Sequence, residues 1–434
     1  MLALHERYPE RYPVLLDSSA VGLPLGRFTL LLAGPGNSLL LDRELRLHGE
    51  GTGDRFCDRL DAWWRRERSG GPAAPWPFAG GWFLFLGYEL ACEVEPSLRL
   101  PPSPLPVVAL AWRMRAALLH DHKTSQSAIL SEPAAAGIAD RLRADLRDIG
   151  ETARPASTGP IAAVSEDDPE RYLAACRKAL AHIAAGDVYQ ANLARTWRAP
   201  IPDGTTAAAL YARLRAANPG AFSGIAQLGE LAILSSSPER LVRVRGRRIE
   251  TRPIAGTRPR LGPGDAAMIA ELTANPKERA EHVMLIDLER NDLGRLCEPG
   301  SVEVDEFMAV ESYAHVHHIV SNVSGRLRGD VTPGAVIRAL FPGGTITGCP
   351  KVRCMQLIGD LEGIGRGAYT GAMGYLALDG SLDLNILIRT MTVQGGEVEL
   401  RAGAGIVADS DPVHELDETR AKARGVLRAL GSAG

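Results

Sequence analysis

The sequence predicts a mixed fold, α+β or α/β, in which strands and helices are interspersed without a regular β-α-β alternation. Apolar residues make up 45% of the 434 residues and charged residues 23%, the balance expected of a globular protein with a sizeable core. Short apolar runs bounded by Gly, Pro, Asn or Asp are typical of strands, and segments of helical periodicity lie irregularly between them. The length allows two or three domains or one large one.

The first 122 residues are predicted to be strands and turns around one helix. Residues 80–88 form an aromatic, apolar run bounded by glycines, the pattern of a buried strand that enters a tight turn. The other elements expected here are strands at 27–31, 38–41, 107–114 and 117–121 and a helix at 54–66. Residues 123–165, rich in Ala, Pro, Ser and Asp around a polar helix at about 137–148, are the candidate boundary. We therefore expect an N-terminal region, 1–155, that packs on a core beginning at 165.

A helix opens the second region, with Asp167 or Asp168 as its N-cap and Pro169 in its first turn, and it stops at Gly186. A strand-like run follows at 187–193. The helices expected after it span 205–217, 264–287 (ended by the segment 291–294), 332–339 and 350–361, and a C-terminal helix is capped by Asp411. The strands expected are 223–227, 231–235, 241–244, 248–253, 301–310, 314–327, 370–378, 383–393 and 397–401.

Composition also bears on compartment and partners. The net charge of −3 gives no general attraction to nucleic acid or to an anionic membrane. The N-terminal residues lack the apolar core of a signal peptide, and no apolar run approaches the roughly 20 residues of a membrane span. The six cysteines contain no CxxC pair, which argues against a zinc site or a disulfide framework. We expect a cytoplasmic protein.

The segment Phe341-Pro-Gly-Gly-Thr-Ile-Thr-Gly-Cys-Pro-Lys351 carries the strongest functional signal. Its glycines let the backbone approach a ligand, and Lys351 and Arg353 add positive charge where an apolar helical pattern begins, which favours an anion. It is not a Walker A loop, because Cys-Pro follows Gly348 where that motif has Lys-Ser or Lys-Thr. Taken alone, an ordinary Gly-rich turn is an equally good interpretation.

A second glycine motif, Gly403-Ala-Gly405-Ile-Val-Ala408, fits GxGxxA after a strand. A dinucleotide-binding fingerprint requires the helix to open at this loop and an acid on a second strand about 20 residues later. Here the helix begins only at Pro412 and the sequence ends at Gly434, so we reject that interpretation. Two glycines remain whose N–H groups are suited to hold a carboxylate.

Three carboxylates are candidate metal ligands. Glu415 and Glu418 share one face of the C-terminal helix at i and i+3, and Glu281 lies on the long helix. Carboxylates from distant segments suit Mg²⁺, which takes few protein ligands together with substrate oxygens. The competing interpretation is a solvated acidic face with Glu418 paired to Lys422 at i+4, and Glu281 as one more surface charge.

The histidines at 315, 317 and 318 lie on an expected strand, where alternation separates His318 from the other two. This argues against a three-histidine metal site, and a polar or acid–base role for His318 competes with that of a packed core histidine. Glu239 ends an apolar strand; partly buried, it would have the raised pKa of a general acid, although such a place is often a turn. Arg389 ends another apolar strand and needs an anionic partner, structural or bound.

Together these residues make the chain resemble the chorismate-utilising enzymes over about residues 165–431, and weakly before them. The matching motifs are Ser237-Pro-Glu-Arg240, Pro253-Ile-Ala-Gly-Thr-Arg-Pro-Arg260, Ala280-Glu-His282, Arg290-Asn-Asp-Leu-Gly294, the segments 315–321 and 342–351, Ile388-Arg-Thr390, Gly403-Ala-Gly405 and Glu418-Thr-Arg-Ala-Lys422. The resemblance implies a large α/β (α+β) sandwich, two mainly antiparallel sheets with helices outside and the site between.

The resemblance also implies roles for individual residues. Glu239 would be the general acid that protonates the departing C4 hydroxyl, a type of catalysis typically worth about 10²–10⁴-fold. Mg²⁺, held by Glu281 and Glu418 with Glu415 close by, would neutralise the ring carboxylate. The residues implied to hold the enolpyruvyl carboxylate are Arg389, Tyr369, Lys422, Gly403 and Gly405, and those implied to line the pocket are Gly256, Thr257, Thr345 and, beside the ring, His318.

Two positions bear on which reaction is expected. Gln190 stands where isochorismate and salicylate synthases carry a lysine base, and glutamine cannot deprotonate water, so ammonia is the expected nucleophile. Motifs around Thr345, Gln190 and Glu239 resemble aminodeoxychorismate synthase component I, the enzyme of para-aminobenzoate and folate synthesis. Ala255 resembles anthranilate synthase component I, because the former enzymes have a nucleophilic lysine there. The first reaction is the expectation, the second its alternative, and a non-catalytic chorismate-binding regulator a third.

A partner is expected as well. Use of glutamine as the ammonia source requires a nucleophilic cysteine with a histidine and an acid. None of the six cysteines lies in the glycine-flanked elbow of a glutaminase domain. By resemblance, a separate glutamine amidotransferase subunit would form a heterodimer with this chain and deliver ammonia.

Overall fold

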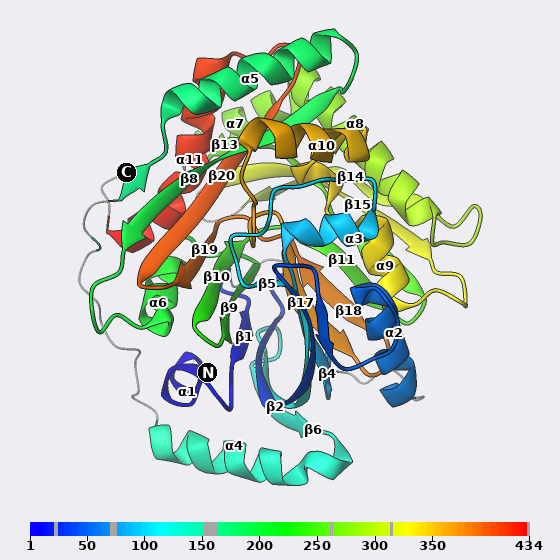
Figure 1. Ribbon diagram of the computed structural model, residues 1–434, viewed down its shortest axis with the longest axis vertical. Helices are drawn as coiled ribbons and strands as arrows, with labels where there is room; N and C mark the ends of the chain where they lie inside the picture. Colours follow the sequence, from blue (N-terminus) through cyan, green and yellow to red (C-terminus); the bar gives the residue numbers. More distant parts are fainter. Residues whose placement is uncertain are drawn as a thin grey trace.

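The computed structural model describes residues 1–20, 25–69, 76–150, 161, 164–260, 262, 264–312 and 316–431. Its described strands belong to one hydrogen-bonded sheet in which every pairing is antiparallel, with helices packed outside (Figure 1). The prediction of a mixed, mainly antiparallel fold with outer helices is therefore confirmed. None of the described helices is long and apolar enough to cross a bilayer.

One arm of the sheet contains the strand that carries Gly403 and Gly405. In order of pairing it comprises β8 (Gln190–Pro200), β20 (Glu397–Ile406), β19 (Thr390–Gln394), β10 (Leu231–Ser237), β9 (Phe222–Leu228) and β1 (Val14–Asp17), with β7 (Ser165–Glu166) and β16 (Gly348–Cys349) beside β8. Helices α11 (Pro412–Leu430), α6 (Ala207–Ala217) and α5 (Pro169–Ala184) pack against this arm.

The other arm begins at the aromatic run predicted around residue 83. In order it comprises β4 (Gly81–Leu86), β17 (Ala372–Ala377), β18 (Leu382–Asn385), β11 (Arg240–Arg245), β12 (Arg248–Thr251), β15 (Val316–Arg326) and β14 (Glu303–Ser312), with β13 (Ile254–Pro259) also paired to β15. The helices around it are α2 (Phe56–Glu67), α3 (Ala91–Val94), α7 (Asp265–Ala274), α8 (Pro276–Gly294) and α9 (Pro333–Leu340), whereas α10 (Lys351–Glu362) contacts β8, β16 and α5 of the first arm.

Two long strands join the arms. β2 (Phe28–Asp42) and β5 (Val107–Asp121) pair along their whole length, with a register shift between Pro35 and Ser38. Their ends pair with β1 and β6 (Gln126–Ser131) in one arm and with β3 (Leu47–Gly49) and β4 in the other. The two predicted sheets are thus continuous, because the pairs of strands predicted at 27–31 and 38–41, and at 107–114 and 117–121, are each one bent strand.

The core between the arms is apolar, as a sandwich of two layers requires. Buried residues from both arms meet there, among them Leu32, Phe83, Phe85, Ile233 and Met373. Two further clusters lie under the outer helices. Helices α1 (Leu2–Arg7) and α4 (Ala136–Ile149) contact each other at the end of the molecule opposite α5 and α10 (Figure 1).

The sheet also includes the N-terminal strands, since β1 pairs with β9 and β4 with β17. The proposed division near 155–165 stays a prediction, and most of that segment lies outside the described residues.

Three sequence expectations were wrong in detail. The helix expected at 264–287 is two helices, because Asn275 before Pro276 is extended, as a residue before proline prefers. α8 then continues to Gly294, through the segment expected to end it. The strand expected at 383–393 is interrupted between β18 and β19, where Arg389 has a φ of +51°.

Candidate active site

Most residues predicted for the site lie in one connected region of the structure. They come from β8 and β20, from the turns that follow β10 and precede β19, from the 341–351 loop and from α11. The links that join them are hydrogen bonds, ion pairs and close backbone contacts. The structure therefore brings together side chains that are up to about half the chain apart in sequence, as a functional site requires.

Glu239 is the most deeply buried carboxylate of the predicted set, with 5% of its surface exposed. The Thr345 hydroxyl donates a hydrogen bond to Glu239 Oε1 at 2.6 Å. Burial raises the pKa of Glu239 to about 7, and the charge of Glu289 adds to the rise, whereas the Thr345 hydrogen bond and the cations of Arg389 and Lys422 oppose it. A carboxyl group with this pKa holds its proton near neutrality and is suited to act as a general acid.

The backbone of the 341–351 loop packs closely against neighbouring side chains. A Cβ atom on Gly344 would come within 2.4 Å of Leu288 Cδ2, and one on Gly343 within 2.9 Å of Ile386 Cδ1. The loop contains a short 3₁₀ turn at Gly344–Ile346 and then β16, and peptide bonds before Pro342 and Pro350 are cis. The two glycines are therefore required by packing, and they hold Thr345 against Glu239.

The positive charges beside this loop have partners within the protein. Lys351 Nζ donates a hydrogen bond to Asp292 Oδ2 and forms a buried ion pair with it. Arg353 pairs with Asp187 at 3.2 Å. The anion that these two cations were expected to attract is thus supplied by protein carboxylates, and the loop acts through Thr345 and its backbone.

The predicted glycines of β20 form a wall with side chains from β8. A Cβ atom on Gly403 would meet Tyr369 Oη at 2.7 Å and Asn192 Oδ1 at 2.9 Å, and one on Gly405 would meet Gln190 Nε2 at 2.2 Å. Within the part of the chain that the structure describes, the buried oxygens Gln190 Oε1 and Asn192 Oδ1 have no hydrogen-bond partner. Buried polar atoms without partners are costly, so this wall fits a ligand that donates hydrogen bonds.

Helix α11 places Lys422 and two predicted metal ligands next to this wall. Lys422 Nζ donates to Gly403 O at 3.1 Å and pairs with Glu418 Oε1 at 2.6 Å. Glu415 accepts a hydrogen bond from Ser410 Oγ at 2.7 Å, and burial, with the charge of Glu418, raises its pKa. The ligand atoms of His414, Glu415 and Glu418 all lie within 4.8 Å of one another.

This group has the chemistry of a divalent-cation site. Two carboxylates offer the oxygen ligands that Mg²⁺ prefers, and they leave positions for water or substrate oxygens. The Glu418–Lys422 pair of the competing interpretation is also present. Glu281 lies half-buried on α8, and the group of candidate ligands found among the described residues does not include it. Its role as a ligand stays a prediction.

His318 and Arg389 complete the region. His318 is buried, and its Nδ1 lies 3.1 Å from Gly256 O, where Gly256 has a φ of +62°. Burial, reinforced by Arg389, lowers the pKa of His318 to about 4, so its imidazole is neutral. Burial raises the pKa of Tyr369 to about 12, so its hydroxyl remains a donor. The side chain of Thr257, on β13, and all of His315 lie outside what is described.

Two residues of this region, one of them fully buried, were not predicted. Asn192 follows Gln190 at i+2 on β8, so strand alternation alone would have placed it on the same face. Glu289 lies on the apolar face of α8 with Ile286 and Leu293, at i+3 and i+7 from Ile286, and is 4% exposed. A charged residue within an apolar stripe was the signal that identifies it.

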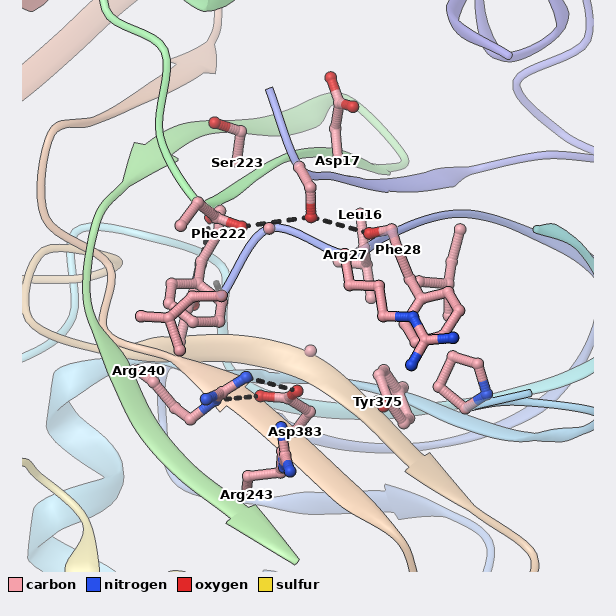
Figure 2. A pocket seen from close by; sticks show the side chains of 18 of the residues that line it. Leu16, Asp17, Arg27, Phe28, Phe222, Ser223, Arg240, Arg243, Tyr375 and Asp383 are labelled. Atoms are coloured by element: carbon pink, nitrogen blue, oxygen red, sulfur yellow. Dashed lines mark hydrogen bonds and ion pairs between the residues drawn. The ribbon is translucent and has the colours of Figure 1, made fainter. Parts of the chain in front are cut away.

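A further large cavity lies elsewhere. Its volume is about 670 Å³, and it opens between the arms near β1, β9 and β11. Figure 2 shows its wall, where Arg240 pairs with Asp383 and the rings of Phe222 and Tyr375 face the space. None of the predicted site residues lines it. Cavity size is therefore a poor guide to the chemistry of this molecule.

Comparison with known proteins agrees with the residue pattern. Residues 35–428 match the model of the chorismate binding enzyme family. The chain is 42% identical over 367 residues to the anthranilate synthase component I-like protein of Synechocystis. This alignment covers 82% of this chain and 73% of the relative. It is 37% identical over 447 residues to the aminodeoxychorismate synthase of Streptomyces griseus, covering 97% of this chain but 61% of the relative. The crystal structure of anthranilate synthase component I from Streptococcus pneumoniae superposes with a TM-score of 0.84 at 30% identity, covering 94% of this chain and 93% of that one.

Proposed function

Because the chain belongs to the chorismate-binding enzyme family, we propose that it adds ammonia to C4 of chorismate and so forms 4-amino-4-deoxychorismate, the precursor of 4-aminobenzoate. The observation that supports this most is the buried Glu239 carboxyl, with its pKa of about 7, held by Thr345 of the glycine-rich loop. In the net reaction a C–N bond forms and the C4 hydroxyl leaves. Glu239 gives its proton to that hydroxyl, which departs as water, and the added ammonia later releases a proton that restores the acid.

The wall of β8 and β20 supports ammonia as the nucleophile. The amide oxygens of Gln190 and Asn192 are acceptors without partners among the described residues, and ammonia offers N–H donors. Neither amide is a base that activates water. We therefore assign these two side chains to holding ammonia on the face of the ring.

Other residues of the region would bind the carboxylates of the substrate. Arg389, Lys422 and the Tyr369 hydroxyl are cationic or hydrogen-bond donors, and Gly403 and Gly405 leave space for the enolpyruvyl group. Glu415 and Glu418, with Glu281 as a further candidate, would hold Mg²⁺. When bound, Mg²⁺ neutralises the ring carboxylate of chorismate.

The product tests the proposal. Purified enzyme, chorismate, MgCl₂ and ammonium chloride are incubated, and the products are analysed by mass spectrometry. We expect an amine that retains the enolpyruvyl group and that an added lyase converts to 4-aminobenzoate. Anthranilate with stoichiometric pyruvate from the enzyme alone would contradict the proposal, and failure to consume chorismate would point to a non-catalytic chorismate-binding regulator.

Anthranilate synthesis is the second candidate because of one residue. Ala255, on β13 beside a register shift, has no nucleophile to offer, as expected of an anthranilate synthase. Relatives named for both reactions are similar to this chain. We favour amination at C4 because the Gly343–Gly344–Thr345 sequence, which positions the acid, resembles that branch, and ammonia then adds without a lysine adduct.

We further propose a glutamine amidotransferase partner. Several relatives, such as the aminodeoxychorismate synthase component 1 of Bacillus subtilis, are named as one component of an enzyme. Burial raises the pKa of all six cysteine thiols, at 57, 92, 176, 297, 349 and 354. A glutaminase nucleophile needs a lowered thiol pKa, so none of the six is suited to that role. Glutamine hydrolysis by the purified chain alone would contradict this proposal, and ammonia release only after addition of an amidotransferase subunit would support it.

A further inference from the structure

A second buried carboxyl group lies beneath the glycine-rich loop, and the reaction proposed above does not use it. Glu289 projects from the buried face of α8 and is 4% exposed, almost the same as Glu239. The Thr251 hydroxyl and the N–H of Gly344 lie near it and favour its ionised form, which lowers its pKa. Burying a carboxyl group this deeply is costly unless the protein uses its hydrogen bonds or its charge.

Consecutive residues of the loop join the two acids. Gly344 packs against the Glu289 carboxylate and its N–H favours the ionised form of that group, and the hydroxyl of the next residue, Thr345, donates to Glu239. A Cβ atom on Gly344 would come within 3.2 Å of Glu289 Oε1, so the loop can approach this carboxyl group only because the residue is glycine. Any displacement of Glu289 would therefore be transmitted to the donor that orients Glu239.

The acids are also coupled through their charges. Burial raises the pKa of each to about 7, and the charge of Glu289 is the largest electrostatic contribution that raises the pKa of Glu239. Like charges in a buried site cannot both ionise easily, so the pair holds a proton in the neutral range.

The groups that face the pair set the direction of this coupling. Glu289 is faced by Asp292 from its own helix, which opposes its ionisation, and by Lys351 from α10, which favours it together with Thr251 and Gly344. Glu239 is faced by the cations Arg389 and Lys422 and by Thr345, which favour its ionisation. Within this set Glu289 is the group whose negative charge raises the pKa of Glu239.

We propose that Glu289 is a positioning residue for the general acid: it fixes Thr345 through Gly344, and its negative charge disfavours the loss of a proton from Glu239. Glu289 itself does not touch the substrate in this scheme. The catalytic part of the inference rests on the proposed amination, whereas the coupling between the two carboxyl groups does not.

The test is the pH dependence of kcat/KM in Glu289→Gln. The glutamine oxygen still accepts from Gly344 and Thr251, but the charge is gone, so the pKa of Glu239 falls. A general acid is active when protonated, and its activity is lost as pH rises through its pKa. We expect the basic limb of the profile to move down by roughly 0.5–1 pH unit, so that activity falls about three- to tenfold above the limb and little below it.

Asp287→Asn is the matched control, because it removes an exposed carboxylate two residues away on the same helix. It should leave the profile unchanged. Thr251→Val is a second variant that keeps the charge but removes one hydrogen bond to ionised Glu289, and it should move the limb in the same direction by less. If Glu289→Gln folds and its basic limb superposes on that of the wild type, the inference is overturned. If Glu289→Gln does not fold, an upward shift of the basic limb in Thr251→Val overturns it instead.

A measurement without substrate separates this inference from the proposed function. The carboxyl carbons of ¹³C-labelled glutamate are titrated by NMR in the wild type and in Glu289→Gln, with Glu239→Gln to assign the signal of Glu239. We expect the midpoint of Glu239 to fall in Glu289→Gln whether or not the enzyme aminates chorismate. An unchanged midpoint refutes the coupling even if the amination is confirmed, and a lowered midpoint in an enzyme that forms another product refutes only the proposed function.

Discussion

Two groups of carboxylates in this molecule have the same chemistry and different surroundings. Beneath the glycine-rich loop, Glu239 and Glu289 are almost fully buried, and each has a pKa of about 7. On α11, Glu418 has a side chain that is 38% exposed and paired with Lys422, and it lies beside Glu415. Burial raises the pKa of Glu239 and Glu289 although cations lie near both, whereas Glu418 is open to solvent and Glu415 beside it is buried. These surroundings suit the first group to the proposed acid catalysis and Glu418 to the proposed metal site.

The largest effect expected from breaking this division is at Glu239. Glu239→Gln keeps the volume and an oxygen that accepts from Thr345, but it has no acidic proton for the departing hydroxyl. We expect kcat to fall by about 10²–10⁴-fold, measured with ammonium chloride and Mg²⁺. Glu230→Gln, at an exposed turn between β9 and β10, is the control. Activity of Glu239→Gln within a factor of two of the wild type would show that Glu239 is not the acid.

The next largest effect is expected at Glu418, the solvent-exposed carboxylate of α11. Glu418→Gln removes a charged oxygen from the proposed metal site and should raise the Mg²⁺ concentration needed for half-maximal rate by at least about tenfold, without a change in thermal stability. The measurement is a Mg²⁺ titration of the initial rate. Asp417→Asn, which alters the neighbouring exposed residue of α11, should leave the titration unchanged. Full activity of Glu418→Gln in the presence of EDTA would exclude it as a ligand.

The two groups also differ in how far the sequence reveals them. Glu415, Glu418 and Lys422 follow from helical spacing alone, and the contacts among them are local. The proximity of Glu239 to Thr345 joins residues 106 positions apart, so the motifs suggested it but only packing shows it. Glu289 was overlooked because Asp287 and Arg290 close to it in sequence suggest a solvated face, and the groups outside its helix that face it come from β12 and the loop.

Backbone details were likewise predictable where the local sequence determines them. Local chemistry predicted the cap of α5 at Asp167 or Asp168 and that of α11 at Asp411, and the structure has Asp168 and Asp411 as the caps. The interruption at Arg389 was not predictable, since nothing local requires a positive φ in a non-glycine residue. The break before Pro276 was predictable from the proline and was missed because the apolar periodicity continues across it.

A smaller effect with a defined sign is expected at Thr345. Its hydroxyl donates to Glu239 and stabilises the ionised form, so Thr345→Val should raise the pKa of Glu239. The basic limb of the kcat/KM profile should then move up by roughly half a pH unit, opposite to the shift expected for Glu289→Gln, while kcat falls a few-fold because the acid is less well oriented. Thr345→Ser keeps the hydroxyl and should restore both. A downward shift of the limb in Thr345→Val would mean that Thr345 stabilises the protonated acid instead.

The smallest effect is expected at His414, which completes the group of candidate ligands on α11. Its imidazole lies within reach of the same point as Glu415 and Glu418, but it is exposed, and Mg²⁺ prefers oxygen to nitrogen. If the site is built for Mg²⁺, His414→Ala should change the Mg²⁺ dependence by less than about twofold. The comparison with Glu418→Gln is what makes this measurement informative, because the two side chains start from the same helical face. A loss as large as that of Glu418→Gln would show that nitrogen contributes to the donor set, and the group would then suit a transition metal such as Mn²⁺ or Zn²⁺ better than Mg²⁺.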